Sequence, residues 1–164
     1  MEAREVTPPT PTLAAPGLRH FADLWVDVGA PLEVGDVGHG LRRLIPIVGG
    51  RCIARDWTAR VLPGGTDFQL LVSDRSARLE ARYVLETDGG DRIYVDNQAV
   101  RSAAPEVMAK LVRGEPVDPA QVYFRCVPRF EVSAPSLVWM RERMFLGTGV
   151  RTPAAVQLSF YEVG

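Results

Sequence analysis

The sequence is poor in the residues that most often build metal centres and disulfide frameworks. Its 164 residues include two cysteines, Cys52 and Cys126, and two histidines, His20 and His39. Two cysteines make neither a disulfide framework nor a zinc site, and neither histidine belongs to a cluster with metal-ligand spacing. The two thiols could pair with each other, but we expect buried free cysteines, because such thiols behave as small apolar side chains. We expect no metal.

An excess of one charge sign is also lacking, and so are long apolar runs. The chain has 19 basic and 20 acidic residues, well mixed, for a net charge of −1. Nucleic-acid binding usually requires a basic surface, so nucleic acid is not an expected partner. No run approaches the ~18 apolar residues of a membrane span, and the opening MEAREVTPPTPTLAAPG has no apolar signal-peptide core. We expect a cytoplasmic protein with no membrane partner.

The glycine-rich segments match no nucleotide-binding fingerprint. The stretches VLPGGTD (61–67) and GTGVRTP (147–153) lack the spacing of a P-loop or a dinucleotide-binding loop. No serine stands in a nucleophile-elbow context, so a hydrolase triad is not expected. A redox cofactor would have to bind without a recognisable signature. We therefore expect a protein that works without a cofactor.

What the chain does have is a succession of short apolar runs separated by Gly, Pro and Asp. Residues 1–17 are rich in proline, and we expect a flexible arm there, ahead of a single domain at 18–164. Within that domain, strands are expected in the segments 18–28, 39–50, 51–65, 66–74, 77–97 (two strands), 122–133, 136–151 and 154–164.

One segment, APEVMAKLVRGE, departs from the strand pattern. Val107, Met108 and Leu111 have helical spacing, with Pro105 at the start and Gly114 at the end. One short helix among many strands with tight turns indicates an all-β fold of antiparallel strands. A barrel and a sandwich both fit. We favour an antiparallel β-barrel of roughly 8–10 strands, because closure removes exposed strand edges.

The stretch ARLEARYVLETDGGDRIYVDN (77–97) predicts a β-hairpin around a turn at 87–90. Along its first strand, Glu80 and Arg82 share one face. The other face carries Leu79, Ala81, Tyr83 and Leu85. From the pattern alone, the charged row faces water and the apolar row forms the core.

Six stretches of the chain form a recognisable series. They are GHGLRRLIPIVGG (38–50), VLPGGTDFQLLVSD (61–74), LEARYVLETDGGDRIYV (79–95), YFRCVPRFEV (123–132), VWMRERMFLGTGVR (138–151) and YEV (161–163). Through them the chain resembles the domain of unknown function 3237 family, also grouped with uncharacterised UPF-type proteins. The resemblance covers about residues 18–163 and implies a small antiparallel β-barrel, but no particular reaction. It places the following residues on motif positions: Arg42, Asp67, Arg82, Tyr123, Arg125, Glu131 and Trp139.

The chain departs from the family pattern at three positions. Glu80 stands where the family favours aspartate, Phe68 where it favours tryptophan, and Arg141 where it favours asparagine. The longer acid and the extra arginine would reshape a pocket. Given the resemblance, we expect Glu80 and Arg82 to face the barrel lumen, with the apolar row packed outward against the helix or a partner subunit.

These expectations define a candidate site. Buried charges must be paired, so arginines and carboxylates of the lumen should match. A desolvated carboxylate has a raised pKa and can act as an acid or base near neutral pH, and an arginine can hold an enolate or carboxylate. The candidate catalytic residues are Asp67, Glu80, Arg82 and Glu131. The candidate ligand-binding residues are Arg42, Phe68, Tyr123, Arg125, Trp139 and Arg141.

Three functions fit this site. The first is a cofactor-independent lyase, isomerase or cyclase that acts by acid–base chemistry on an oxygenated, partly apolar small molecule, in secondary metabolism or aromatic catabolism. The second is a non-catalytic barrel that binds such a molecule. In the third, the strands mainly build a homodimer or higher homo-oligomer.

Overall fold

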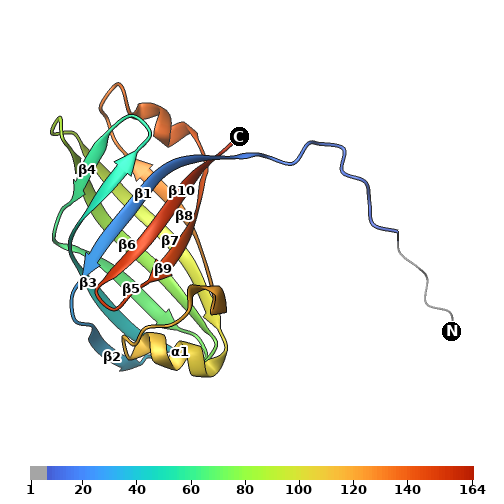
Figure 1. Cartoon of the computed structure of the whole chain (residues 1–164), viewed down its shortest axis with the longest axis vertical. Helices are drawn as coiled ribbons and strands as arrows, with labels where there is room; N and C mark the ends of the chain where they lie inside the picture. The colour runs from blue at the N-terminus through green and yellow to red at the C-terminus, as the bar shows by residue number, and fades with distance from the viewer. Residues whose placement is uncertain (1–6) are drawn as a thin grey trace.

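The computed structural model describes residues 7–164, which fold into a β-barrel with one α-helix (Figure 1). The strands within this range are β1 (Leu18–Val28), β2 (Leu32–Asp36), β3 (Leu41–Ala54), β4 (Thr58–Val61), β5 (Gly65–Leu71), β6 (Ser76–Thr87), β7 (Arg92–Ala103), β8 (Val122–Glu131), β9 (Phe145–Arg151) and β10 (Ala155–Val163). The helix is α1 (Pro105–Val112), and two short 3₁₀ helices are η1 (Pro119–Gln121) and η2 (Val138–Glu142).

The barrel closes because β1 pairs with β10 on one side and with β3 on the other. Going around it, the order is β1, β10, β9, β8, β7, β6, β5 and β3, and neighbouring strands are antiparallel. β2 and β4 add to this ring at its ends. The prediction of an all-β antiparallel barrel with one short helix is confirmed. The predicted hairpin at 77–97 is also confirmed, as β6 and β7.

The predicted end of a strand at Gly49–Gly50 is wrong. β3 runs through both glycines, pairing with β5 before them and with β1 and β4 after them. Gly50 has φ +133°, and a Cβ there would lie 2.1 Å from the Trp25 carbonyl oxygen. Glycine therefore lets β3 bend from one pairing to the next without leaving the sheet.

Two other details differ from the predicted strands. The segment 136–151 was expected to be one strand, but its first part forms η2, where Met140 is buried, and β9 begins at Phe145. β2 lies in a stretch for which no strand was predicted. It is short and pairs with β3 along one side.

Aromatic side chains fill the barrel end that lies near β4 and η2 (Figure 1). The Phe145 ring lies 4.9 Å from Phe21 and 5.1 Å from Phe130, between ring centroids. Trp57 and Trp139 pack edge-on against Phe21. Such pairs add to the large apolar area that each ring buries. We call this cluster the aromatic plug, because it closes one end of the barrel.

The other end of the barrel lies next to α1 and β2 (Figure 1). α1 begins at Pro105, as predicted, and buries Val107, Met108 and Leu111 against the barrel. Gly114, with φ +74°, ends the helical turn. α1 therefore covers this end with one apolar face, whereas aromatic rings fill the opposite end.

Residues 7–17 form an exposed segment without helix or strand that leads away from the barrel (Figure 1). The first six residues of the expected arm lie outside the described part of the chain. The backbone amide of Gly164 donates to the Gly17 carbonyl at 2.9 Å, which joins the two ends of the barrel domain. Within residues 7–164, no helix is long and apolar enough to cross a membrane.

Candidate functional site

A cavity lies inside the barrel, between the aromatic plug and α1. Its volume is about 40 Å³, enough for several water-sized groups. Most of its wall is apolar, and small side chains such as Ala81 and Ala99 leave the space open. The cavity adjoins an outer hollow of about 480 Å³ at the end near α1, and both are lined by Arg101, Arg151, Gln69, Ile45 and Val28. We call the cavity the lumen and the outer hollow the mouth.

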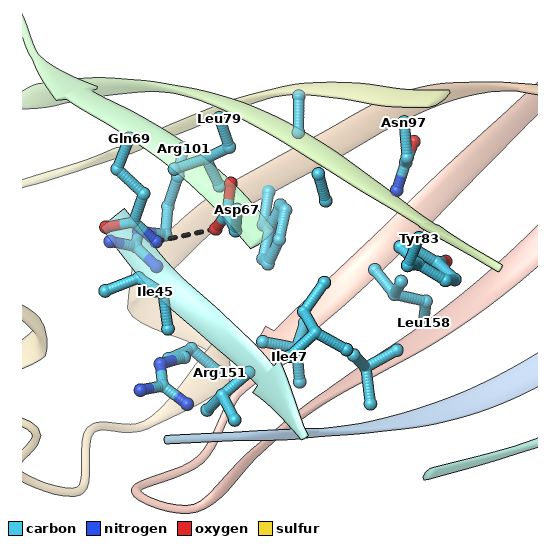
Figure 2. Close-up of a pocket in the computed structure, with 16 residues that line it drawn as sticks. Ile45, Ile47, Asp67, Gln69, Leu79, Tyr83, Asn97, Arg101, Arg151 and Leu158 are labelled. Carbon is cyan, nitrogen blue, oxygen red and sulfur yellow. Dashed lines mark hydrogen bonds between the residues drawn. The ribbon is translucent and has the colours of Figure 1, made fainter. Parts of the chain in front are cut away.

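Asp67 is the carboxylate of the lumen. It lies on β5, on the inward face that it shares with Gln69, and the Gln69 amide nitrogen donates to its Oδ2 at 2.8 Å (Figure 2). Among the described residues, the other oxygen, Oδ1, has no hydrogen-bond partner. Burial raises the pKa of Asp67, although Gln69, Arg101, the Glu80 backbone amide and Arg151 act in the opposite direction. This side chain therefore holds its proton more readily than an ordinary aspartate.

Arg101, on β7, is the guanidinium beside Asp67 (Figure 2). It is 2% exposed, and its Nε has no hydrogen-bond partner in the described part of the chain. Burial lowers the pKa of Arg101 to about 10; Asp67 opposes this effect, whereas Arg151 and Arg43 add to it. Arg101 thus remains positively charged at neutral pH.

Two more arginines lie at the mouth. The Arg43 side chain is 6% exposed, and its Nε lies 2.9 Å from a carboxylate oxygen of Glu33, which is 60% exposed. The Arg43 Nε–H does not point at this oxygen well enough for a hydrogen bond, so the contact is an ion pair. The Arg151 Nη1 donates to the carbonyls of Thr152, at 2.7 Å, and Ala155, at 3.2 Å. Burial lowers the pKa of Arg151, as it does that of Arg101.

Neutral polar groups line another part of the lumen. Figure 2 shows Tyr83 and Asn97 on one side of the lumen, and Asp67, Gln69 and Arg101 on the other. Within residues 7–164, the Tyr83 hydroxyl and the Asn97 Oδ1 have no hydrogen-bond partner. Burial raises the pKa of Tyr83 well above its usual value, so this hydroxyl stays protonated and can donate.

The two cysteines are buried and free, as expected. Burial raises the pKa of Cys52 to about 12 and that of Cys126 to about 11. Thiols with such pKa values are almost fully protonated at neutral pH, so they are poor nucleophiles. No group of three or more potential metal ligands occurs within the described range.

Of the residues proposed from the sequence, Asp67 is the one that lines the lumen; the others lie elsewhere. The expected lumenal orientation of Glu80 and Arg82 is wrong. Inward positions on β6 belong to Leu79, Ala81, Tyr83 and Leu85, and a strand alternates its faces. Arg82 is 45% exposed and lies on the outer face, 3.6 Å from Glu80 and 3.9 Å from Asp96.

The other candidates are distributed over the outside of the barrel and its aromatic end. The Arg82 guanidinium lies 5.9 Å from the centre of the Phe68 ring, so Phe68 belongs to the same outer face. Arg42 also lies outside the lumen. Its neighbour Arg43 pairs with Gln69, which faces the lumen, and successive residues of a strand point to opposite faces.

Tyr123, Arg125 and Glu131 all lie on the exposed face of β8, and the Arg125 guanidinium lies 5.1 Å from the centre of the Tyr123 ring. Trp139 contributes to the aromatic plug and to a shallow hollow outside it, and Arg141 is exposed on η2. The matched arginine–carboxylate set expected in the lumen is therefore wrong in its members, apart from Asp67.

Most of the polar groups inside the barrel were not among the residues predicted from the sequence. They are Arg43, Gln69, Tyr83, Asn97, Arg101 and Arg151. A signal for two of them was present: Ile93, Val95, Asn97, Ala99 and Arg101 share one phase of β7, and three of the five are apolar. A polar residue on an apolar face is the informative exception, because burying it is costly.

Comparisons with known proteins place the chain in a family. Residues 16–163 match the family described as "Protein of unknown function (DUF3237)". The UPF0311 protein of Rhodopseudomonas palustris (strain ATCC BAA-98 / CGA009) is 38% identical over 154 residues, which cover 94% of this chain and 99% of that protein. The UPF0311 protein of Clostridium acetobutylicum is 37% identical over 139 residues, or 84% of this chain and 88% of the relative.

Solved structures agree with this placement. The crystal structure of a conserved protein of unknown function from Rhodopseudomonas palustris has a TM-score of 0.89 at 37% identity, and the match covers 94% of this chain and 100% of that one. A beta-barrel like protein from Acinetobacter baumannii has a TM-score of 0.79 at 32% identity, with 98% and 100% covered. An enzyme from Penicillium herquei shares the fold at 17% identity, with a TM-score of 0.68 and the same coverage. By sequence and by fold, the chain belongs to the DUF3237 family, the group of UPF0311 proteins.

Proposed function

We propose that the barrel binds a small, oxygenated, partly apolar molecule in its lumen and converts it by cofactor-independent acid–base chemistry. One observation carries the proposal: the half-buried Asp67 lies in the lumen beside the Arg101 guanidinium, with its Oδ1 shielded and unpaired among the described residues and its pKa raised. A carboxyl group with this environment is suited to proton transfer near neutral pH. Asp67 is the acid–base group, and the other candidates on the outer surface take no part in this proposal.

The chemistry would be proton transfer next to a carbonyl. Asp67, as carboxylate, takes a proton from the carbon beside the carbonyl, and the electron pair moves onto the carbonyl oxygen. Arg101 stabilises the resulting negative charge in a site shielded from water. Asp67 then returns the proton at another carbon, which is an isomerisation. Alternatively, a leaving group on the β-carbon departs with its electron pair as the enolate forms the C=C bond, as in a lyase. In a cyclase, Asp67 takes the proton of an internal hydroxyl while its oxygen bonds to the β-carbon of an enone, the C=C pair moves into the enolate, and Asp67 returns the proton to the α-carbon.

Two further features support a reaction in this lumen. The aromatic plug closes one end and α1 borders the mouth at the other, so water reaches the lumen from one side. The fold is shared with a protein described as an enzyme, from Penicillium herquei. At 17% identity this likeness concerns the fold, and it supports the idea that such a barrel can hold an active site.

Deuterium exchange tests the proposal. The wild type, Asp67→Asn and Asp74→Asn are incubated in D₂O with crotonate, pyruvate, cyclohex-2-enone and 2-hydroxyacetophenone, and ¹H NMR follows loss of the C–H signals. We expect faster exchange of at least one compound with the wild type and with Asp74→Asn, an exposed matched control. In Asp67→Asn the exchange rate should fall by at least about 100-fold, in line with the loss of a general base.

The alternative function, a non-catalytic binding barrel, gives a different result. Its supporting observation is that the unpaired polar atoms of Tyr83, Asn97 and Arg101 suit binding whether or not a reaction follows. A compound that binds in the lumen but is recovered without exchange would favour binding alone. Exchange that persists undiminished in Asp67→Asn would contradict the role of Asp67.

A further inference from the structure

The charges at the lumen end near the mouth do not balance. Arg101, Arg43 and Arg151 lie close enough that Arg43 and Arg151 lower the pKa of Arg101, and Arg43 lowers that of Arg151. The carboxylates facing them are Asp67, whose pKa is raised, and Glu33, which is largely exposed. Three buried or half-buried guanidinium groups therefore share two carboxyl groups. Asp67 ionises less readily than an ordinary aspartate, and Glu33 is largely in contact with water.

Such an arrangement is costly unless an anion completes it. A buried guanidinium needs hydrogen-bond acceptors as well as a counter-charge. Arg101 is 2% exposed, and its Nε has no acceptor among residues 7–164. Arg151 gives its Nη1 to two backbone carbonyls, which carry no charge. A carboxylate matches this deficit, because its two oxygens accept from the fork of one guanidinium.

We propose that Arg101 and Arg151 form a carboxylate-binding subsite, so that the natural ligand is a small carboxylic acid. This inference rests on the proposed function, since it names the substrate class of the same lumen. The carboxylate lies at the arginine end, and the rest of the molecule extends into the apolar part of the lumen. Its far end meets Tyr83 and Asn97, which suit a hydroxyl or carbonyl group (Figure 2).

This orientation places the reacting carbons beside Asp67. A carboxylate held by Arg101 brings its α- and β-carbons toward the neighbouring Asp67 side chain, and Gln69 holds one oxygen of that side chain at 2.8 Å. The free Asp67 oxygen, Oδ1, is then available for the proton. The same arginines that hold the carboxylate would stabilise negative charge that forms on it after proton removal.

Glu33 acts as a built-in competitor at the mouth. It lies on β2, 60% exposed, with its carboxylate 2.9 Å from Arg43. A ligand carboxylate held by Arg101 and Arg151 is repelled by Glu33, which also offsets the positive charge of the neighbouring Arg43. Removing the Glu33 charge therefore strengthens the binding of a carboxylate and leaves the binding of a neutral ligand unchanged.

Binding of crotonate and crotonamide tests the subsite, because the two molecules have nearly the same shape and differ in charge. Titrations at constant ionic strength are followed by ¹H–¹⁵N NMR, with the side-chain Nε–Hε signals of arginine included. We expect crotonate to bind the wild type at least tenfold more tightly than crotonamide. The affinity for crotonate should fall at least tenfold in Arg151→Gln and in Arg101→Gln, and it should rise several-fold in Glu33→Gln.

Arg78→Gln is the matched control, because Arg78 is an exposed arginine on the outer face of β6, and its crotonate affinity should equal that of the wild type. Arg151→Gln provides the decisive variant if Arg101→Gln fails to fold, since Arg151 is only partly buried. Equal binding of crotonate and crotonamide, binding of neither, or affinity unchanged in Arg151→Gln would overturn the subsite. Asp67-dependent exchange of a neutral compound with no preference for crotonate would leave the proposed function standing without this subsite.

Discussion

At the scale of single residues, Asp67 and Arg101 are the groups whose surroundings depart most from those of ordinary surface charges. Arg101 is buried in the lumen and Asp67 is half-buried there, and loss of contact with water shifts the pKa of each toward the neutral form. Each partly offsets the cost of burying the other. Charged groups that a protein keeps inside at such a cost are typical of functional sites.

The stability of the protein should therefore depend on the Asp67 carboxyl. Because the pKa of Asp67 is raised, the folded protein holds this proton more tightly than the unfolded chain does. The wild type should therefore lose stability as pH rises from about 3.8, the ordinary pKa of aspartate, through the pKa of Asp67 in the folded protein. Asp67→Asn keeps the shape and cannot ionise. We expect the two proteins to have equal melting temperatures in acid and the variant to melt higher at pH 7–8, by circular dichroism from pH 3 to 8. A lower melting temperature of the variant at pH 7 would mean that the arginines stabilise the carboxylate more than burial destabilises it.

At the scale of elements, the bend of β3 holds the barrel together. Its first half pairs with β5 and its second half with β1, so the bend at Gly49–Gly50 joins the two sides of the closure. This bend also carries Arg43 and Ile45 to the mouth and Cys52 to the core farther along. The closure thus depends on a backbone conformation that ordinary side chains rarely adopt.

The two glycines of this bend give a matched pair of substitutions. Gly50→Ala should reduce the free energy of unfolding by at least about 2 kcal/mol, because the new Cβ would meet the Trp25 backbone at a strained φ of +133°. Gly49→Ala should change it by less than about 1 kcal/mol, since the nearest atom would be a side-chain oxygen of Asp27 at 3.8 Å. Urea denaturation measures both. Equal losses would show that the bend does not depend on Gly50.

The elements themselves were largely predictable, because their signals are local. The turn at 87–90 and the alternation on both sides of it predicted the hairpin, and Pro105 with Gly114 marked the helix. The Gly49–Gly50 boundary failed for a tertiary reason: paired glycines usually end a strand, but here partners on both sides continue the ladder. β2 was missed because a short strand paired along one side carries little periodicity.

At the scale of the whole molecule, the barrel has two unlike ends. One is filled by aromatic rings, and the other combines α1 with an arginine-lined mouth. The lumen lies between them, so the plug provides stability while the mouth provides access. This division separates the residues that hold the barrel closed from those proposed to bind a ligand.

The plug should dominate the stability of the barrel. Phe145→Ala removes a fully buried ring from contact with Phe21 and Phe130, and we expect a loss of about 3–5 kcal/mol in the free energy of unfolding. Phe68→Ala, on the outer face beside Arg82, should cost clearly less, about 1 kcal/mol, because that ring is only partly buried and lies outside the core cluster. Chemical denaturation compares the two variants, and a similar loss for both would argue against the plug.

The sequence by itself determined the fold class, the single helix and the long hairpin, because periodicity, prolines and glycines act over a few residues. It also identified Asp67 as a candidate. Only the tertiary structure decided which face of each strand lines the lumen. An alternating strand offers two faces, and closure of the barrel turned Leu79, Tyr83 and Arg101 inward, with Glu80 and Arg82 outside. A buried arginine is tolerated only where groups from other strands compensate its charge, and those groups come together only when the barrel closes.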